Sequence, residues 1–191
     1  MSDRIEAQIA FLREADQLKS VLRASRLIDL SRFENSAEHS WHVMLYALVL
    51  ADQAGPEVDI SRVLKMLLIH DIVEIDAGDS PIHGQVDSAA QEAAEQAAAD
   101  RLFGLLPDDQ NDDFRALWDE FEVGETPDAR FAKAIDRVQT PVANLASGGG
   151  NWRDYDVTLE KLDQRVGQPI SRGAPGLWHW LRPKLQSFFS S

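Results

Sequence analysis

The sequence contains no cysteine at all. This absence excludes a disulfide framework, thiolate metal ligands and a cysteine nucleophile, and it is typical of a protein kept in a reducing compartment. Long hydrophobic runs are missing too. No stretch reaches the roughly 18 uncharged apolar residues of a membrane span, and the N-terminal MSDRIEAQIA lacks the apolar run of a signal peptide. We therefore expect a cytoplasmic protein that does not bind a membrane.

Basic residues are scarce as well. The sequence has 19 Lys and Arg against 32 Asp and Glu, which gives a net charge of −13 at pH 7. Non-specific nucleic-acid binding depends on basic patches that displace counterions, so we expect no nucleic-acid partner. The same acidic surface repels small anionic substrates at long range. A site for a phosphate ester would therefore need its own positive charge, from a divalent metal and a few arginines.

Apolar residues recur at helical spacing, and no segment alternates convincingly with a period of two. The pattern predicts an all-α protein, a compact helical bundle in which residues 1–191 form a single domain. In the first helix, the predicted core positions are Ile5, Ile9, Leu12, Leu18 and Leu22. The helices are expected over roughly residues 4–22, 37–53, 60–73, 88–105, 109–121, 127–145, 155–166 and 175–189.

Helix ends are marked by familiar signals. Asn35 with Glu38 three residues later predicts a capping box at the start of the second helix. Thr126 followed by Pro127 predicts an N-cap and first helical position for the sixth. The loops are short except for residues 76–87, and a loop of that length in a compact bundle is more often functional than idle.

Two imidazoles and two carboxylates stand on three of the inner helices: His39 in AEHSWHVM, His70 and Asp71 in LLIHDIVEI, and Asp136 in FAKAIDRV. An ionised aspartate among apolar neighbours needs a partner or a metal. Four nitrogen and oxygen ligands suit Mn²⁺, Co²⁺, Fe²⁺ or Mg²⁺, and two imidazoles also allow Zn²⁺ or Ni²⁺. Taken singly, each histidine is more often a hydrogen-bonded core residue, and Asp136 could simply pair with its neighbours Lys133 or Arg137.

Two further carboxylates follow the histidine–aspartate pair. Glu74 shares a helical face with His70 and Asp71, and Asp79 comes just after Gly78. Such carboxylates could position a nucleophilic water or relay its proton. The alternative is that both are solvated surface residues.

At these residues the sequence resembles the HD-domain superfamily of metal-dependent phosphohydrolases. It is most similar to the branch with the 5′-deoxynucleotidases and HD-domain-containing protein 2. The resemblance covers three separated blocks in the family's order, with a metal-binding core over roughly residues 19–145 and C-terminal helices, residues 154–190, expected to pack on it. These blocks are LKSVLRASRLIDLSRFENSAEHSWHV, LLIHDIVEIDAGD and LWDEFEVGETPDARFAKAIDRVQ.

The resemblance implies a single divalent metal ion held by His39, His70, Asp71 and Asp136. It also implies that Glu74 and Asp79 are the family's catalytic acidic pair, and that Arg23 contacts the substrate phosphate. The expected activity is hydrolysis of a phosphomonoester, a nucleoside 5′-monophosphate, through attack of metal-activated water. The family further suggests a homodimer.

The sequence departs from the family in two places. Ala24 stands where the nucleotidases have a tryptophan that helps to select the deoxyribose, so the preference between ribose and deoxyribose stays open. The segment NLASGGGNWRDYDV is unlike the corresponding part of those enzymes. Its Trp152 either covers the pocket or packs on the core, and we favour core packing.

Two other functions compete with the nucleotidase interpretation. An HD hydrolase could instead act on another phosphorylated nucleotide, such as a diester, a triphosphate or an alarmone, although a single ligand set argues against two-metal phosphodiesterases. A non-catalytic nucleotide-binding protein is the other alternative. The presence of the full ligand set together with Glu74 and Asp79 argues against it.

Overall fold

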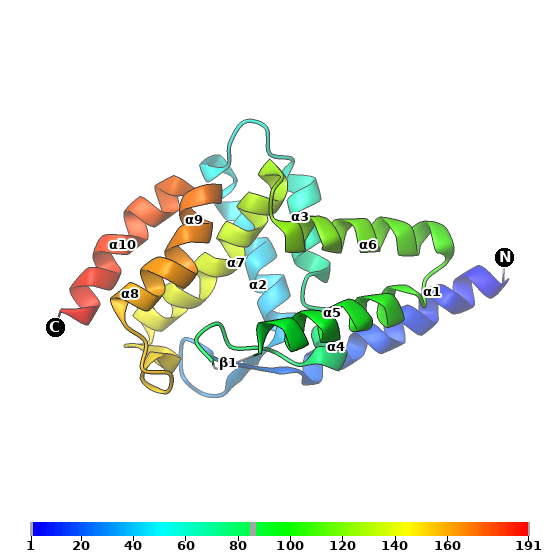
Figure 1. The fold of residues 1–191 in the computed structure, drawn as a ribbon, viewed down its shortest axis with the longest axis horizontal. Helices are drawn as coiled ribbons and strands as arrows, with labels where there is room; N and C mark the ends of the chain where they lie inside the picture. The colour runs from blue at the N-terminus through cyan, green and yellow to red at the C-terminus, as the bar shows by residue number, and fades with distance from the viewer. Residues whose placement is uncertain (1, 85–86, 191) are drawn as a thin grey trace.

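The computed structural model describes residues 2–84 and 87–190, and the chain is mostly helical (Figure 1). The expected all-α fold is confirmed. The expected loop over residues 76–87 includes residues 85 and 86, which lie outside the described residues. In the first half, the helices are α1 (Ser2–Ala15), the 3₁₀ turn η1 (Asp16–Ser20), α2 (Ser36–Val49), the 3₁₀ turn η2 (Ala51–Gln53), α3 (Ile60–Ile69) and α4 (Glu74–Ala77).

The second half of the chain supplies the longest helices. Helix α7 runs through the middle of the molecule, with α8 to α10 on one side and α1, α5 and α6 on the other (Figure 1). No helix in the described part of the chain is long and apolar enough to cross a membrane. The elements are α5 (Ser88–Phe103), α6 (Asp108–Val123), α7 (Pro127–Ala146), the 3₁₀ turn η3 (Gly150–Arg153), α8 (Leu159–Leu162), the π-helical turn η4 (Asp163–Gly167), α9 (Gln168–Gly173) and α10 (Pro175–Phe189).

The predicted caps of the two helices that carry site residues are confirmed. The side chain of Asn35 accepts a hydrogen bond from the Glu38 amide at 2.9 Å, and the Glu38 side chain binds the Asn35 amide in return. Thr126 caps α7 through the amide of Ala129. These caps fix where α2 and α7 begin, and therefore where along each helix His39 and Asp136 reach the interior.

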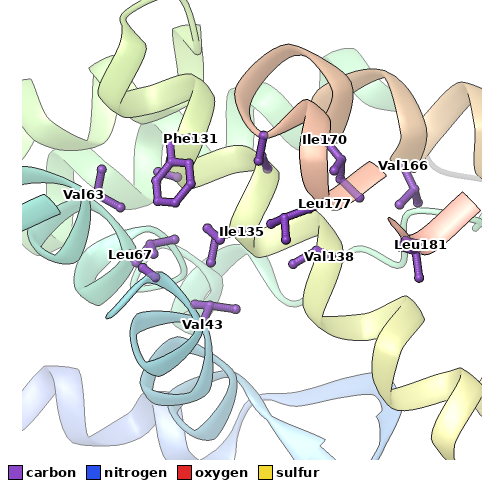
Figure 2. Close-up of a cluster of buried hydrophobic side chains, with 14 of the residues drawn as sticks. Val43, Val63, Leu67, Phe131, Ile135, Val138, Val166, Ile170, Leu177 and Leu181 are labelled. Atoms are coloured by element: carbon purple, nitrogen blue, oxygen red, sulfur yellow. The ribbon is translucent and has the colours of Figure 1, made fainter. Parts of the chain in front are cut away.

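The larger core cluster is built around α7 (Figure 2). Its buried side chains come from α2, α3 and α7 and from the C-terminal helices, so all four regions share one apolar interior. Burying apolar surface of this kind is the main favourable term in folding. Members labelled in Figure 2 are Val43, Val63, Leu67, Phe131, Ile135, Val138, Val166, Ile170, Leu177 and Leu181.

A second cluster holds α1, η1, α5 and α6 together around Phe11, Leu18, Phe103 and Trp118. Trp118 is buried, and its indole N–H donates to the backbone carbonyl of His70 at 3.2 Å. That hydrogen bond ties α6 to the end of α3, where two of the predicted ligands lie.

The predicted core of the first helix is largely wrong. Leu18 is buried, but Ile5, Ile9, Leu12 and Leu22 are exposed. Helix α1 ends at Ala15, seven residues earlier than expected, and packs instead through the stripe that begins at Phe11.

A short antiparallel hairpin follows that was not predicted. Strands β1 (Leu22–Arg26) and β2 (Phe33–Asn35) pair Leu22 with Asn35 and Arg26 with Phe33. Strands this short leave too few positions for a two-residue alternation to show. In the connecting turn, Asp29 accepts hydrogen bonds from the backbone N–H and hydroxyl of Ser31.

Candidate metal centre

The first predicted ligand, His39, lies in the first turns of α2 and is fully buried. Its Nε2 lies 2.9 Å from Oδ1 of Asp136, which projects from the middle of α7. Burial raises the pKa of the Asp136 carboxyl, but the positive charge of Arg137, the hydrogen bond from His39 and the nearby His70 ring outweigh burial and hold this pKa well below its ordinary value. Asp136 is therefore an ionised carboxylate in the interior.

The next two predicted ligands, His70 and Asp71, follow the last residue of α3. The Nδ1–H of His70 donates to the carbonyl of Leu67 at 2.9 Å, which leaves Nε2 facing the site. This Nε2 lies 3.0 Å from Oδ1 of Asp71 and 3.7 Å from Oδ1 of Asp136. Although burial lowers it, the carboxylates of Asp71 and Asp136 raise the pKa of His70 to about 9. The site thus draws positive charge to its centre.

These atoms fit a divalent cation. One ligand atom each from His39, His70 and Asp136 lies within 4.8 Å of the others, and all three residues are buried. Nε2 of His70 is buried without a hydrogen-bond partner among the described residues. A buried polar atom of this kind needs a partner, and a metal ion would supply one. Two imidazoles and a carboxylate, with Asp71 beside them, form a donor set suited to borderline divalent ions.

Arg23, on β1, points into the same site and lies among carboxylates. Its Nη1 is 3.1 Å from Asp71, 3.5 Å from Asp79 and 3.9 Å from Glu74. Although burial opposes it, these carboxylates raise the pKa of the guanidinium, which stays charged. The hairpin that the sequence did not predict is therefore the element that brings Arg23 to the metal cluster.

The predicted acidic pair, Glu74 and Asp79, lies close to this arginine, and both carboxylates face its Nη1. Glu74 accepts a hydrogen bond from the hydroxyl of Ser36 at 2.5 Å, and burial together with the nearby Asp71 raises its pKa to about 8. Asp79 accepts from the amide of Ala24 at 3.2 Å, and burial raises its pKa as well. Both carboxyl groups are held in place, and both can exist in the protonated form closer to neutrality than an ordinary acid.

Two adjoining cavities open onto the site. The more polar one has a volume of about 180 Å³ and is lined by His70, Asp71, Glu74 and Lys133 among others. The second measures about 60 Å³ and is lined by Ala24, His83, Asn151, Trp152 and Tyr155 among others. Shared between them are Arg23, Asp79, Ser80, Asp136 and Arg137.

The glycine-rich segment noted in the sequence forms part of the smaller cavity. Asn151 donates to the carbonyl of Ala24 at 3.3 Å and accepts from Asn144 at 2.9 Å, so the segment is bonded to β1. Trp152 is buried against the rings of Phe188 and Phe189 on α10 and also lines the cavity. The two interpretations of Trp152 are therefore compatible, since one indole does both.

The structure brings together all seven predicted residues. It also adds two that sequence reasoning did not assign to the site. Glu34 on β2 is buried beside His39 and Arg23, and Arg137 borders both cavities. Nothing in the sequence distinguishes Glu34 from the other acidic residues, because its place depends on the hairpin. Arg137 could have been noticed, because it directly follows Asp136.

Comparison with known proteins agrees with this geometry. Residues 15–178 match the family model described as HD domain. The chain is 28% identical to the 5′-deoxynucleotidase HDDC2 of Bos taurus, over 81% of this chain and 77% of that protein. It is 31% identical to a 5′-deoxynucleotidase of Klebsiella pneumoniae, over 81% of this chain and 82% of the relative.

Solved structures show the same fold. A predicted metal-dependent phosphohydrolase from Magnetospirillum magnetotacticum MS-1 superposes with a TM-score of 0.92 at 47% identity, covering 97% of this chain and 95% of the other. A protein from Pyrococcus horikoshii OT3 shares the fold at a TM-score of 0.68 and 21% identity, covering 92% of this chain and 99% of the other.

Proposed function

This chain belongs to the HD domain family, and we propose that it is a metal-dependent phosphohydrolase that releases phosphate from a nucleoside 5′-monophosphate. The observation that carries the proposal is that residues able to bind a metal and residues able to bind phosphate and transfer protons lie in one pocket. A buried cluster of His39, His70 and Asp136 lies beside an arginine and two protonatable carboxyl groups. The names of the relatives support the substrate class.

His39, His70, Asp71 and Asp136 would hold one divalent metal. The family and the cluster of donor atoms support such an ion, and the donor set admits Mn²⁺, Co²⁺, Mg²⁺, Fe²⁺, Ni²⁺ or Zn²⁺. When bound, such an ion polarises a phosphate oxygen and lowers the pKa of a coordinated water.

Arg23 and Arg137 would bind the oxygens of the phosphate. Arg23 is the rigid member of the pair, because the carboxylates of Asp71 and Asp79 fix its guanidinium at the base of the pocket. Arg137 is the more accessible member, with a side chain 37% exposed at the junction of the two cavities. Planar guanidinium groups suit phosphate because they offer paired donors.

Glu74 and Asp79 would handle the protons of the reaction. The Ser36 hydroxyl donates to Oε2 of Glu74. Oε1 is therefore the oxygen that would take a proton from the attacking water, once the positive charge of a bound metal has ionised this carboxyl group. Asp79 has a raised pKa and borders both cavities, so its carboxyl group can deliver a proton to the oxygen of the departing nucleoside as the P–O bond breaks.

An assay of the purified protein against a panel of nucleoside 5′-monophosphates, with Mn²⁺ or Co²⁺ added, tests the proposal. We expect inorganic phosphate to be released, and the Asp71→Ala variant to be silent. A panel that yields no metal-dependent phosphate at any protein concentration would reject phosphomonoester hydrolysis. Appearance of pyrophosphate or a linear dinucleotide would move the activity to a triphosphate or a diester.

We also propose that the chain is a homodimer. Two helices expose apolar stripes at helical spacing, Ile5, Ile9 and Leu12 on α1 and Trp41, Leu45 and Leu48 on α2. Contiguous exposed apolar surface on a folded protein usually marks an interaction site. Light scattering after size exclusion should give twice the chain mass, and a Trp41→Glu, Leu45→Glu variant should elute as a monomer. A wild type of monomer mass would reject the homodimer.

A further inference from the structure

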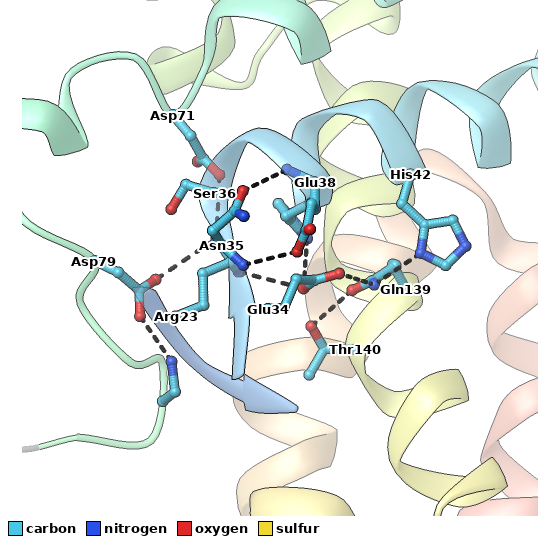
Figure 3. A network of polar contacts seen from close by, with 12 residues as sticks. Arg23, Glu34, Asn35, Ser36, Glu38, His42, Asp71, Asp79, Gln139 and Thr140 are labelled. Atoms are coloured by element: carbon cyan, nitrogen blue, oxygen red, sulfur yellow. Dashed lines mark hydrogen bonds and ion pairs between the residues drawn. The ribbon is translucent and has the colours of Figure 1, made fainter. Parts of the chain in front are cut away.

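Glu34 is a buried acidic residue at the centre of a network of polar contacts (Figure 3). One of its oxygens, Oε1, accepts a hydrogen bond from Nε2 of Gln139 at 3.2 Å. Gln139 is itself fixed on both sides, since its Nε2 also lies 3.2 Å from Nδ1 of His42 and its Oε1 accepts from the Thr140 hydroxyl at 3.0 Å. The direction of the second Glu34 oxygen is therefore set by a rigid support.

That second oxygen, Oε2, faces two donors. Nδ1 of His39 lies 3.6 Å away and Nε of Arg23 lies 3.7 Å away. All three atoms are buried, and none of them has a hydrogen-bond partner among the described residues. A well-formed water bridge does not fit between either pair, because two hydrogen bonds of about 2.8 Å that meet at the tetrahedral angle of a water separate the bridged atoms by roughly 4.5 Å.

Three buried polar atoms that face only one another are costly unless they pair. The separations exceed a good hydrogen bond by about half an ångström, so a small side-chain movement is enough to close both contacts. We propose that Oε2 of Glu34 accepts hydrogen bonds from both His39 and Arg23, and that Glu34 is the positioning residue that locks these two side chains together. This inference rests on the metal site of the proposed function.

The consequence for His39 is a fixed tautomer. When Nδ1 carries the proton and donates it to Glu34, Nε2 can give up the proton that it donates to Asp136 in this structure and offer its lone pair to a metal. Such a carboxylate partner orients the ring and increases the basicity of the ligand nitrogen. In His70, the Leu67 carbonyl accepts from Nδ1 and orients the ring in the same way. In both histidines Nδ1 is then bound to the protein, and Nε2 is left for the metal.

The consequence for Arg23 is that its position depends on the same carboxylate. Nε is held by Glu34, while Nη1 faces Asp71 and Asp79. Glu34 thereby sets the spacing between the side chain expected to bind phosphate and a side chain expected to bind metal.

The test compares wild type with Glu34→Gln, which keeps the shape but removes the charge, and with Glu34→Leu, which removes the acceptor. Glu38→Gln is the matched control, because it makes the same charge change four residues away and glutamine still serves in a capping box. Isothermal titration with Mn²⁺ should show a Kd raised by about 10–100-fold in both Glu34 variants, the usual loss for such a partner. Glu38→Gln should bind like wild type.

A second measurement reports the hydrogen bond itself. In the zinc-loaded wild type, NMR should show a slowly exchanging imidazole N–H from Nδ1 of His39, and Glu34→Leu should lack it. If Glu34→Leu does not fold, Glu34→Gln decides, with this resonance shifted by loss of the charged acceptor. If the Glu34 variants bind Mn²⁺ with the Kd of wild type, or if their His39 N–H resonance is the same as in wild type, the inference is overturned. Neither measurement needs turnover, so failure to hydrolyse any substrate would reject the proposed function alone.

Discussion

Replacing Arg137 with glutamine is expected to weaken phosphate binding without unfolding the protein. Five carboxylates surround the site, and Arg23 is close to four of them. Within the described residues, Arg137 forms one ion pair, with Asp136 at 3.7 Å, which leaves most of its charge available to a ligand. One charge-assisted hydrogen bond contributes about 1.5–3 kcal/mol. Because the Arg137 side chain is 37% exposed, solvent screening places the effect near the lower end, at roughly tenfold in KM.

The assay is steady-state hydrolysis of a nucleoside 5′-monophosphate, together with competitive inhibition by inorganic phosphate. In Arg137→Gln, both KM and the inhibition constant should rise roughly tenfold, while Arg137→Lys should recover part of the loss. Arg130→Gln is the matched control on the same helix, since Arg130 pairs with Glu125 away from the cavities. Unchanged KM and phosphate inhibition in Arg137→Gln would refute the reasoning. A change in the Kd for Mn²⁺ alone would assign Arg137 to metal binding through Asp136.

Three other outcomes are expected. Asn35→Ala removes the side-chain acceptor of the α2 capping box and should lower the free energy of unfolding in urea by about 1 kcal/mol; an unchanged midpoint would count against the cap. Saturating Mn²⁺ at one hundred times its Kd should stabilise wild type by about 2.7 kcal/mol in thermal unfolding, and Asp136→Asn should lose this increment while keeping its metal-free stability within a few degrees. Burial and the positive charges of Arg165, Lys161 and Arg137 lower the pKa of His83 to about 4. The unfolded chain therefore binds a proton on His83 at a higher pH than the folded protein does, and the free energy of unfolding should fall as the pH drops from about 6.5 toward 4. In His83→Asn this pH dependence should be weaker, and a curve parallel to that of wild type would contradict the prediction.

The sequence allows the helices with strong caps to be placed, and the reason is local. Asn35 with Glu38, and Thr126 with Pro127, satisfy the same amides in the structure that the sequence pattern assigns to them. Helix α1 shows where local reasoning fails. It carries two apolar stripes, one through Ile5, Ile9 and Leu12 and the other beginning at Phe11. Periodicity alone cannot tell which stripe faces the protein, and the choice is made by Phe103 and Phe114 on α5 and α6, which pack against Phe11.

The candidate site divides in the same way. His39 and Asp136 could be predicted because each stands at an inward position of a helix with a clear N-cap, and His70 directly follows the apolar run of α3. Arg23 could be named only through the family resemblance, because its approach depends on a hairpin with no visible alternation. Glu34 could not be found from the sequence at all, since it reaches His39 by the pairing of β2 with β1 rather than by helical spacing.

The carboxyl groups around Asp136 and the positively charged groups of the site depend on one another. Glu34, Asp71, Glu74, Asp79 and Asp136 bring five carboxyl groups into a buried region of an already acidic protein. Desolvation makes each negative charge costly unless a positive charge compensates it. The neighbouring carboxylates raise the pKa of His70 to about 9, and burial together with Asp71 raises that of Glu74 to about 8. Both side chains therefore bind protons when no other cation is present. If the proposed divalent ion replaces the proton on His70, we expect a phosphate to bind beside Arg23 and Arg137. With five carboxyl groups at the site, we therefore expect an anion to bind much more tightly when the metal is present than when it is absent.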